Sequence, residues 1–518
     1  MEEDFLTSVN SLSQKALLII LDGFGINPNT NKNAIRDAKK PNLDSLFNDY
    51  PYTTISACGT AVGLPDGVMG NSEVGHLNLG AGKPVRQDLI RINEAIENNS
   101  LKNMGQLQKL ISFAQNHTKR IHMMGLLSDG AVHSHIDHIK ALIDIFSEHK
   151  DLKLFFHALM DGRDTPVDHG IKYLQELGPF KDKFQFASMQ GRSIGMDRDR
   201  RWEKIEHCYK TITGQGDVTN LSPQEYLKGQ YESNIYDEFI TPVLFDKEFA
   251  IQPGDAFFFI NFRPDRAIQI SLCLNDPHFS EFEVPIRPEF YLCMTPYIDD
   301  EVKLPILFDK ERIKGGLSEY LAEQGIHQFK IAETEKYAHV TYFFNGGEKK
   351  PFKGETQVLV PSPREVATYD LKPEMSAHEV TKKLMEALDD DEYRLYVVNY
   401  ANSDMVGHTG NYEAAKKCIE VLDECVGELI KKCDENSISF LLTADHGNSD
   451  QMVHPDGSPH TAHTKAKVPC CLFHPKLKGV KLKSIEGGAL KDVAPTLLSM
   501  MGVPIPPQFE GIPIFQEE

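Results

Sequence analysis

Acidic and histidine side chains follow several short apolar runs of the sequence, and they are of the types that bind divalent metal ions. Asp22 closes the run KALLIILDG, and Asp404 and His408 follow YVVNYAN. Asp445 and His446 follow FLLTA. Carboxylate oxygens mixed with imidazole nitrogens suit Mn²⁺, Zn²⁺ or Co²⁺ better than Mg²⁺. The pattern therefore predicts a metal site, although each Asp taken alone would more commonly be a helix cap.

The spacing of these residues suggests how ions could be bound. Asp404 and His408 are four residues apart, so on a helical turn both side chains would point to one side. Asp445 and His446 are adjacent and would diverge, so that one could bridge two ions or both could bind one ion from different sides. We therefore expect a two-metal site. The segment PHTAHT adds two further histidines just downstream, His460 and His463.

Ser72 is the candidate nucleophile. It lies between Asn71 and Glu73 in a glycine-rich segment, GLPDGVMGNSEVGHLNLGAG, at a predicted loop-to-helix junction. A serine hydroxyl needs an adjacent base or a coordinated metal to attack near neutral pH. His76 is the one histidine nearby in the sequence, so coordination to a metal is the better explanation. A helix N-terminus would also favour a bound phosphate; the alternative is a serine that only caps the helix.

A second set of predicted strand ends, between Ser72 and Asp404, carries arginines. Arginine forks bind carboxylate and phosphate groups through two hydrogen bonds. Because the net charge is −20, this clustering indicates a small anionic ligand, and ion-paired surface arginines are the alternative. His133 and Asp164 are candidates for moving a proton to or from a substrate hydroxyl. The polar residues of these strand ends are Asp129, His133, His135, Asp161, Arg163, Asp164, Arg192, Arg198, Arg200, Arg201, Arg263 and Arg266.

Strands buried on both faces are the elements expected to hold these residues. Eight apolar runs are continuous rather than alternating, which is typical of parallel sheets, and helical patterns such as 412–433 and 489–501 lie among them. This order indicates an α/β fold, in which functional residues gather at the carboxyl ends of strands. Each of the eight runs has Asp, Arg or His within its last three residues. The runs are 15–23, 119–130, 153–164, 183–192, 255–266, 393–404, 437–447 and 467–475.

The length of 518 residues predicts at least two domains. The predicted metal ligands lie on both sides of the arginine-rich block, so a second domain inserted into a loop of the first is the simplest arrangement. We expect residues 1–82 and 310–518 to form the metal-binding domain and residues 87–305 to form an inserted substrate-binding domain. Catalysis would then need both domains.

Composition narrows the classes of protein that remain. Asp and Glu total 75 against 55 Lys and Arg, which argues against nucleic-acid and anionic-membrane partners. The nine cysteines form no CxxC pair and are expected to be reduced. The acidic, polar start is unlike a secretory signal, and the strongest apolar run, 16–21, is far shorter than the ~20 residues that span a bilayer. We expect a soluble cytoplasmic protein.

Ten motifs, in one order, make the chain resemble the cofactor-independent phosphoglycerate mutase family of the alkaline phosphatase superfamily. The resemblance runs from about Lys15 to the C-terminus and implies an α/β fold: an alkaline-phosphatase-like core with a mainly parallel sheet, interrupted by an inserted second α/β domain. It implies interconversion of 3-phosphoglycerate and 2-phosphoglycerate without 2,3-bisphosphoglycerate. Ser403 and Ala131 replace a common proline and glycine of the family, and neither change removes a functional group. The motifs are LDGFG, MGNSEVGH, LSDGAVHSH, MDGRDTP, GRSIGMDRD, NFRPDRA, TEKYAHVTYFFNGG, SDMVGHTG, TADHGN and HTAHT.

The resemblance also implies roles for individual residues. Ser72 would become phosphorylated, and Lys336 would neutralise charge on the transferring group. Two divalent ions are implied, with Mn²⁺ expected and Mg²⁺, Co²⁺ or Zn²⁺ as alternatives. Asp404, His408 and His463 would bind one ion; Asp22, Ser72, Asp445 and His446 would bind the other. The implied substrate-binding residues are His133, Arg163, Asp164, Arg192, Arg198, Arg263, Arg266 and Lys336, of which His133, Asp164 and Lys336 would also act in catalysis.

Three other functions remain open from the sequence. A metal-dependent phosphatase would admit water to the phosphoserine, and a phosphopentomutase should lack GRSIGMDRD and NFRPDRA in this arrangement. A non-catalytic metal- or anion-binding protein should have lost Ser72 or part of the ligand set. We expect a monomer with a small-molecule substrate. The sequence leaves open whether His133 or Asp164 is the general base, and residues 1–14 are given no role.

Overall fold

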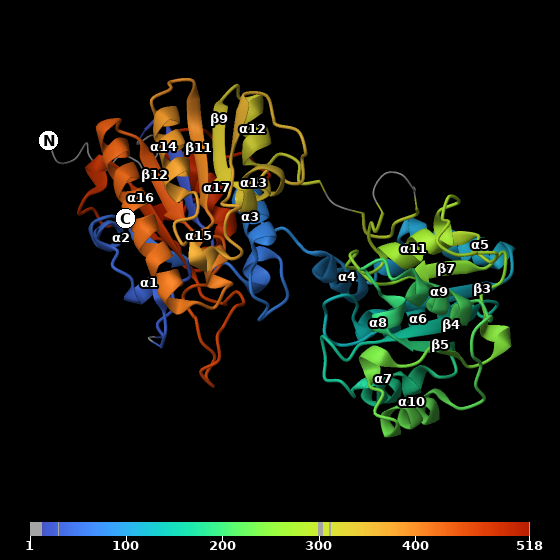
Figure 1. The fold of residues 1–518 in the computed structure, drawn as a ribbon. Helices are drawn as coiled ribbons and strands as arrows, with labels where there is room; N and C mark the ends of the chain where they lie inside the picture. The colour runs from blue at the N-terminus through green and yellow to red at the C-terminus, as the bar shows by residue number, and fades with distance from the viewer. Residues whose placement is uncertain (1–12, 30, 299–303, 310–311, 517–518) are drawn as a thin grey trace. The chain divides into compact units, whose positions relative to one another are not determined.

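The computed structural model describes residues 13–29, 31–298, 304–309 and 312–516. The chain forms two compact units, residues 1–87 with 312–518 (unit 1) and residues 88–311 (unit 2). Each unit contains a mainly parallel sheet flanked by helices, so the predicted α/β class is confirmed (Figure 1). In the described part of the chain, no helix has both the length and the apolar character needed to cross a membrane.

The sheet of unit 1 has seven strands in the order β10-β9-β11-β1-β12-β13-β2. The central strand β1 (Ala16–Leu21) is parallel to both of its neighbours, β11 and β12. All six of its side chains are apolar and buried, which explains why this strand lies at the centre of the sheet. The other strands are β9 (His327–Glu333), β10 (Glu355–Val360), β11 (Tyr393–Tyr400), β12 (Ser439–Thr443), β13 (Val468–Phe473) and β2 (Tyr52–Ile55).

Strand β13 differs from the parallel arrangement that its apolar run suggested. All six of its residues are buried, as the run predicts, but it is antiparallel to both β12 and β2. Continuous hydrophobicity reports burial on two faces, and this strand is covered on both faces whichever way it runs. The prediction of a buried strand is confirmed, and its direction is a correction.

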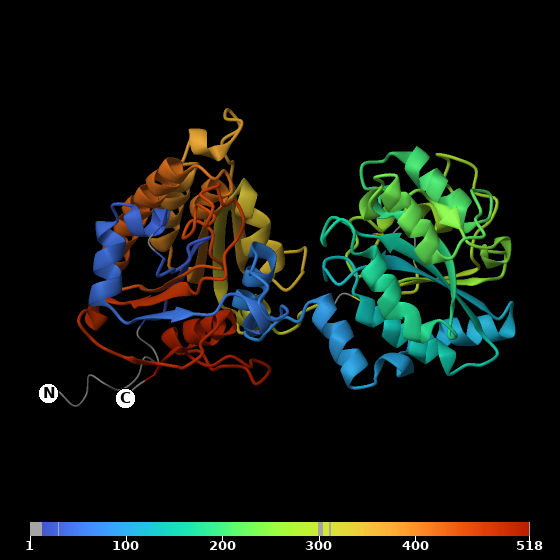
Figure 2. The same cartoon turned by 90° about the horizontal axis from the view of Figure 1, so that it is seen from below.

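Helices cover both faces of this sheet (Figure 2). On one side lie α14 (Ala377–Leu388) and α16 (Tyr412–Glu435), and on the other lies α17 (Val493–Met500), which packs against α3 (Ser72–Ala81). The predicted helix at 412–433 is therefore present. The one predicted at 489–501 begins as a short 3₁₀ turn, Leu490–Asp492, and continues as α17.

Unit 2 has a six-stranded sheet in the order β6-β5-β4-β3-β7-β8. Alternate residues of β3 enter two different apolar clusters, Ile121 and Met123 on one face and Met124 and Leu126 on the other. Helices α6 (Ile136–Ser147) and α9 (Trp202–Ile212) contribute to these two clusters respectively. The strands are β3 (Arg120–Leu127), β4 (Lys153–Met160), β5 (Gln185–Gly191), β7 (Ala256–Phe259) and β8 (Phe290–Cys293), all parallel, with the short antiparallel β6 (Val243–Leu244).

Candidate functional site

Ser72 is the first residue of α3, but it is not the residue that caps the helix. Asn71 is the N-cap, and its side chain accepts a hydrogen bond of 3.0 Å from the backbone N–H of Val74. The hydroxyl of Ser72 is therefore available for other partners. It is buried, donates to Asp22 Oδ1 at 3.2 Å and lies 3.0 Å from His446 Nε2. The alternative of a simple capping serine is wrong for this position.

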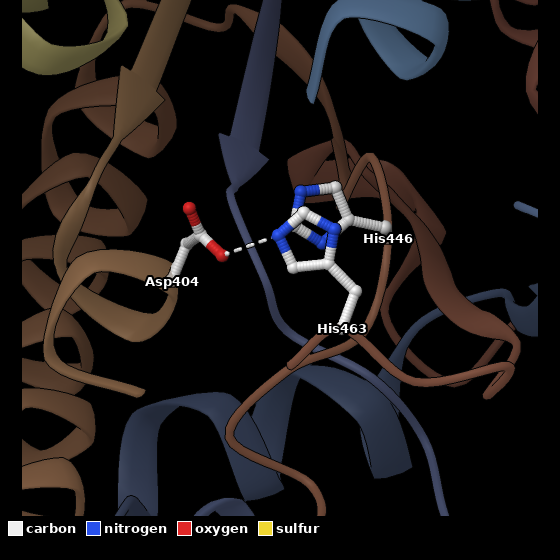
Figure 3. Close-up of side chains that lie close together, drawn as sticks. All are labelled: Asp404, His446 and His463. Carbon is white, nitrogen blue, oxygen red and sulfur yellow. Dashed lines mark ion pairs between the residues drawn. The ribbon is translucent and has the colours of Figure 1, made fainter. Parts of the chain in front are cut away.

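One group of possible metal ligands gathers Asp404, His446 and His463, whose ligand atoms all lie within 4.8 Å of one another. Figure 3 shows the carboxylate of Asp404 facing the two imidazole rings, with His463 Nε2 3.3 Å from Asp404 Oδ1. The rings of His446 and His463 stack with their centroids 3.9 Å apart. His408 Nε2 is 3.2 Å from Asp404 Oδ1 and 3.1 Å from His463 Nε2. His408 therefore joins Asp404, His446 and His463 in one cluster.

A second group consists of Asp22, His76 and Asp445, again with ligand atoms within 4.8 Å, and all three residues are buried. Asp445 Oδ1 accepts hydrogen bonds from the backbone N–H groups of Gly23 and His446. Asp445 Oδ2 is buried without a hydrogen-bond partner among the described residues. An unsatisfied buried carboxylate oxygen is costly, and a bound cation would satisfy it. The donors of both groups thus fit divalent cations.

Lys336 joins the two groups. It lies on α13 (Thr334–Ala338), and its Nζ is 2.6 Å from Asp22 Oδ1, 2.6 Å from Asp404 Oδ2 and 2.8 Å from Ser72 Oγ. Burial lowers the pKa of Lys336, but the two carboxylates outweigh it and raise the pKa above its usual value. The ammonium group therefore stays charged beside the serine hydroxyl.

The two carboxylates that contact Lys336 differ in their acidity. Burial raises the pKa of Asp22 to about 7, and the nearby Asp445 adds to this effect. Burial also acts to raise the pKa of Asp404, but Lys336 and hydrogen bonds from His408 and His463 reverse the effect and hold it well below the usual value. Equal distances to one lysine thus give opposite shifts, because burial and Asp445 act on Asp22, whereas Asp404 accepts hydrogen bonds from two histidines.

In unit 2, the residues at the carboxyl ends of β4 and β5 form an ion-pair cluster around a buried arginine. Arg192 is 2% exposed, and its Nη1 lies 2.5 Å from both Asp161 Oδ1 and Asp164 Oδ2. Nε of Arg192 has no hydrogen-bond partner among the described residues. Burial and the positive charge of Arg192 lower the pKa of His133 to about 4, so its imidazole is neutral near pH 7. A neutral imidazole can accept a proton.

The other arginines lie at the edge of this cluster. Arg198 Nη1 and Arg263 Nε converge on Asp265, at 3.0 and 3.1 Å, and His133 Nδ1 is 3.7 Å from the same carboxylate. Arg163 pairs with Glu238 at 3.4 Å. The side chains of Arg163, Arg198 and Arg263 are about half exposed, at 54%, 45% and 50%.

Arg266 shows how closely these guanidinium groups are packed. Its Nη1 donates a 3.0 Å hydrogen bond to the backbone carbonyl of Met196. Burial lowers the pKa of Arg266, and the positive charges of Arg198, Arg192 and Arg163 lower it further. Like charges held this close create a local field that favours an anion, in a protein whose net charge is −20.

Several residues singled out in the sequence lie outside these clusters. His460 packs its ring against His454, with centroids 4.7 Å apart. Asp129 binds Lys172 and Tyr173, His135 caps α6, and Arg201 pairs with Asp197 and Asp199. The sequence reasoning also missed Asn399, whose Nδ2 donates to Asp22 Oδ2 at 2.8 Å. The sequence feature that could have identified Asn399 is a lone amide side chain near the end of the apolar run YVVNY.

Both the fold and the site define a metal-dependent enzyme class: the chain belongs to the metalloenzyme superfamily, whose family description matches residues 14–505. A relative from Clostridium novyi (strain NT), named 2,3-bisphosphoglycerate-independent phosphoglycerate mutase, is 45% identical over 96% of this chain and 99% of the relative. A relative of the same name from Bacteroides thetaiotaomicron is 44% identical over 96% of this chain and 99% of that protein.

A solved structure is similar over nearly the whole chain. The crystal structure of Leishmania mexicana phosphoglycerate mutase at low cobalt concentration has a TM-score of 0.66 and 30% identity, and it covers 97% of this chain and 98% of its own. The resemblance inferred from the motifs is therefore confirmed. The chain is a member of the 2,3-bisphosphoglycerate-independent phosphoglycerate mutase family.

Proposed function

We propose that this protein interconverts 3-phosphoglycerate and 2-phosphoglycerate through a phosphoserine at Ser72, without 2,3-bisphosphoglycerate. The observation that carries the proposal is the position of Ser72 Oγ, which lies 2.8 Å from Lys336 Nζ and 3.0 Å from His446 Nε2. Relatives with 44–45% identity are named for this activity. These contacts support the proposal, because phosphoryl transfer needs a positioned nucleophile beside a positive charge.

In the first transfer, Ser72 would act as the alkoxide, its proton having passed to solvent, and its Oγ would attack the phosphorus while the bond between the phosphorus and the glycerate oxygen breaks. Lys336 would donate to the transferring phosphoryl group, since its ammonium lies beside the hydroxyl and remains charged. Two divalent cations, when bound, would lower the pKa of the serine hydroxyl and offset the charge of the phosphoryl group. Asp164 or His133 would protonate the departing glycerate oxygen.

In the second transfer, the phosphoryl group would return from Ser72 to the other hydroxyl of the same glycerate. The arginines of unit 2 would hold the carboxylate while glycerate reorients, and Asp164 or His133 would remove the hydroxyl proton. His133 is suited to accept a proton because its imidazole is neutral near pH 7. Retention of glycerate and exclusion of water would separate this enzyme from a phosphatase, in which water cleaves the phosphoserine.

We assign the ions as the resemblance implies, with Mn²⁺ as the expected metal. Asp404, His408 and His463 would bind one ion and Asp22, Ser72, Asp445 and His446 the other, and a mixed carboxylate–imidazole set suits Mn²⁺, Co²⁺ or Zn²⁺. The structure of the Leishmania enzyme at low cobalt concentration supports a role for a borderline cation. Unit 1 would carry the metal chemistry, unit 2 would bind phosphoglycerate, and the protein would act as a cytoplasmic monomer.

The proposal is tested by following both products and the intermediate. Purified protein with Mn²⁺ is given 3-phosphoglycerate, and 2-phosphoglycerate is measured with an enolase-coupled assay while inorganic phosphate is measured in parallel. Acid-quenched samples are analysed for phosphoserine at residue 72 by mass spectrometry. We expect 2-phosphoglycerate with little free phosphate. Phosphate release as the main outcome would identify a phosphatase, and turnover of a pentose phosphate alone would identify a phosphopentomutase.

A further inference from the structure

Two buried polar side chains behind Ser72 have no part in the proposed mechanism. His76 lies one turn after Ser72 on α3, and Asn399 lies near the end of β11, directly opposite Ile20 of β1. Both are fully buried. A buried histidine and a buried amide each need hydrogen-bond partners, and those partners determine which way each group is oriented.

The orientation of Asn399 follows from its contact with Asp22. Its side-chain nitrogen lies 2.8 Å from Asp22 Oδ2, where an amide oxygen would repel the carboxylate. The same nitrogen lies 3.0 Å from His76 Nε2, so this ring nitrogen must be the acceptor. The amide oxygen of Asn399 has no partner among the described residues, which is the cost of donating in both directions.

The tautomer of His76 follows from that orientation. Because Nε2 accepts from Asn399, the ring proton is on Nδ1. Nδ1–H then donates to the backbone carbonyl of Ser72 at 2.8 Å and faces Asp445 Oδ2 at 3.3 Å. A chain of contacts thus runs from Asp22 through Asn399 and His76 to the first turn of α3 and to Asp445.

This chain leaves one oxygen of each carboxylate 3.5 Å from the same atom, His446 Nε2. Asp22 Oδ2 is held by Asn399, while Asp22 Oδ1 lies 3.2 Å from Ser72 Oγ and 3.5 Å from His446 Nε2. Asp445 Oδ1 is held by two backbone N–H groups, while Oδ2 lies 3.5 Å from the same imidazole nitrogen. Outer hydrogen bonds of this kind orient ligand atoms and tune the affinity for a cation.

We propose that His76 and Asn399 are positioning residues, which orient Asp22, Asp445 and the start of α3 so that Asp22 Oδ1, Asp445 Oδ2 and the Ser72 hydroxyl face one cation position. The inference deepens the proposed function and rests on it for the role of Ser72. The rival assignment makes His76 itself a ligand, together with Asp22 and Asp445, because their ligand atoms lie within 4.8 Å. The two assignments exclude each other, since Nδ1 carries the proton that it donates to the Ser72 carbonyl and the lone pair of Nε2 accepts from Asn399, which leaves neither ring nitrogen able to bind a cation.

The first experiment reads the tautomer in the unsubstituted protein. ¹⁵N-histidine-labelled protein is loaded with diamagnetic Mg²⁺ or Zn²⁺, and the ring nitrogens of His76 are assigned by comparison with His76→Asn. If His76 is a positioning residue, we expect its Nδ1 to be protonated and its Nε2 to be unprotonated, as its hydrogen bonds require. An unprotonated Nδ1 in the loaded protein would overturn the proposal in favour of direct ligation.

The second experiment removes the donors of Asn399 with Asn399→Leu, a substitution of similar size. We expect the affinity for Mn²⁺ to fall about 10- to 100-fold with two ions still bound at saturation, and kcat to fall while KM for 3-phosphoglycerate changes less than about twofold. Asn42→Leu is the matched control, because Asn42 donates to the Asp423 carboxylate at 2.9 Å away from this cluster. It should keep the Mn²⁺ affinity and kcat of the unsubstituted protein.

Three results would count against the positioning role. If Asn399→Leu has the same Mn²⁺ affinity and kcat as the control, the amide of Asn399 is not needed to orient Asp22 and His76. A His76→Asn protein that binds a single ion at saturation would make His76 a ligand. If the leucine variant fails to fold, the tautomer of the unsubstituted protein still decides between the assignments. The Mn²⁺ affinity and the tautomer of His76 are measured without enzymatic turnover. Failure of the positioning role can therefore be distinguished from failure of the proposed mutase function.

Discussion

The two units organise their charged residues in opposite ways. In unit 1, acidic and histidine side chains are buried around one serine and one lysine, and Asp22, Asp445 and His446 have side chains with no exposed surface. In unit 2, Arg192 and Asp161 are buried, and three other arginines are about half exposed and paired with carboxylates at the edge. Unit 1 thus holds a fixed, buried set of acidic and histidine side chains, and unit 2 holds an accessible set of arginines.

This difference is consistent with the proposed roles, in which unit 1 carries the chemistry and unit 2 binds the substrate. A fixed, buried cluster pays its reorganisation cost during folding, so its groups are aligned before any substrate arrives. Exposed arginines paired with Asp265 or Glu238 can exchange those carboxylates for anionic groups of a ligand. Substitutions in unit 1 should therefore abolish chemistry, whereas those in unit 2 should weaken binding.

Ser72→Ala should have the largest effect on activity. Loss of the nucleophile should reduce mutase turnover more than about 1,000-fold while Mn²⁺ remains bound to the other ligands. Enolase-coupled kinetics and metal analysis of the purified variant measure both quantities. Ser271→Ala removes a buried hydroxyl bonded to Tyr291 in unit 2 and is the matched control. Substantial turnover by the Ser72 variant would refute the phosphoserine route.

Removal of divalent ions should abolish activity and destabilise unit 1 selectively. Without cations, the carboxylates of Asp22 and Asp445 repel each other and Asp445 Oδ2 lacks a partner. We expect the unfolding temperature of unit 1 to fall by about 5 °C or more in a chelator, and that of unit 2 to stay unchanged. Calorimetry with and without Mn²⁺ tests this, and equal shifts in both units would contradict the comparison.

Arg263→Ala should affect binding rather than chemistry. Losing one charge-assisted contact to the substrate should raise KM for 3-phosphoglycerate about 10-fold, with kcat and metal content little changed. Arg201→Ala is the matched control, because Arg201 is also a surface arginine paired with acids but lies outside the cluster. An unchanged KM would remove Arg263 from the substrate site.

Glu333→Gln should have the smallest effect, on the pH dependence of unit 1. The carboxyl group of Glu333 accepts a hydrogen bond from Ser362 at 2.8 Å, and burial raises its pKa to about 7. Between its usual pKa and about pH 7 the folded state holds a proton that the unfolded state has lost, so stability falls as pH rises through this range. The amide should reduce that loss, by about 3 kcal/mol at most. Urea unfolding at pH 5 and pH 8 measures it, and parallel pH profiles for both proteins would be the contrary result.

The sequence predicted the strands of the site well because their signal is local. Apolar runs marked β1, β11 and β12, and carboxyl ends of parallel strands meet at one edge, which is why Asp22, Asp404 and Asp445 come close together. The direction of β13 depends on its neighbours and is not encoded in its own composition. His460 and His463 lie in the same short segment, but His463 joins Asp404 and His446 whereas His460 packs against His454. This difference depends on the path of the backbone, which the sequence of the segment did not predict.

Strand β9 escaped prediction because its buried residues are partly polar. Gln328 and Lys330 are fully buried, and Lys330 is satisfied by an ion pair of 3.0 Å with Glu355 on β10 and by Ser318 and Asn345. Such partners lie far along the chain, so hydropathy alone reads the segment as surface. For the same reason, the sequence did not predict the position of Asn399 or the orientation of His76. Both depend on contacts with residues elsewhere in the chain, Asp22 and Ser72, rather than on spacing.

The central place of β1 has a consequence for synthesis on the ribosome. Its two neighbours, β11 and β12, follow it by more than 370 residues, whereas every strand of unit 2 is complete before residue 312. Nascent chains would therefore carry an unpaired, wholly apolar segment through most of translation, since that strand waits for its distant partners. Premature termination anywhere before β11 would leave this segment exposed and prone to aggregation, even where the middle of the polypeptide has already folded.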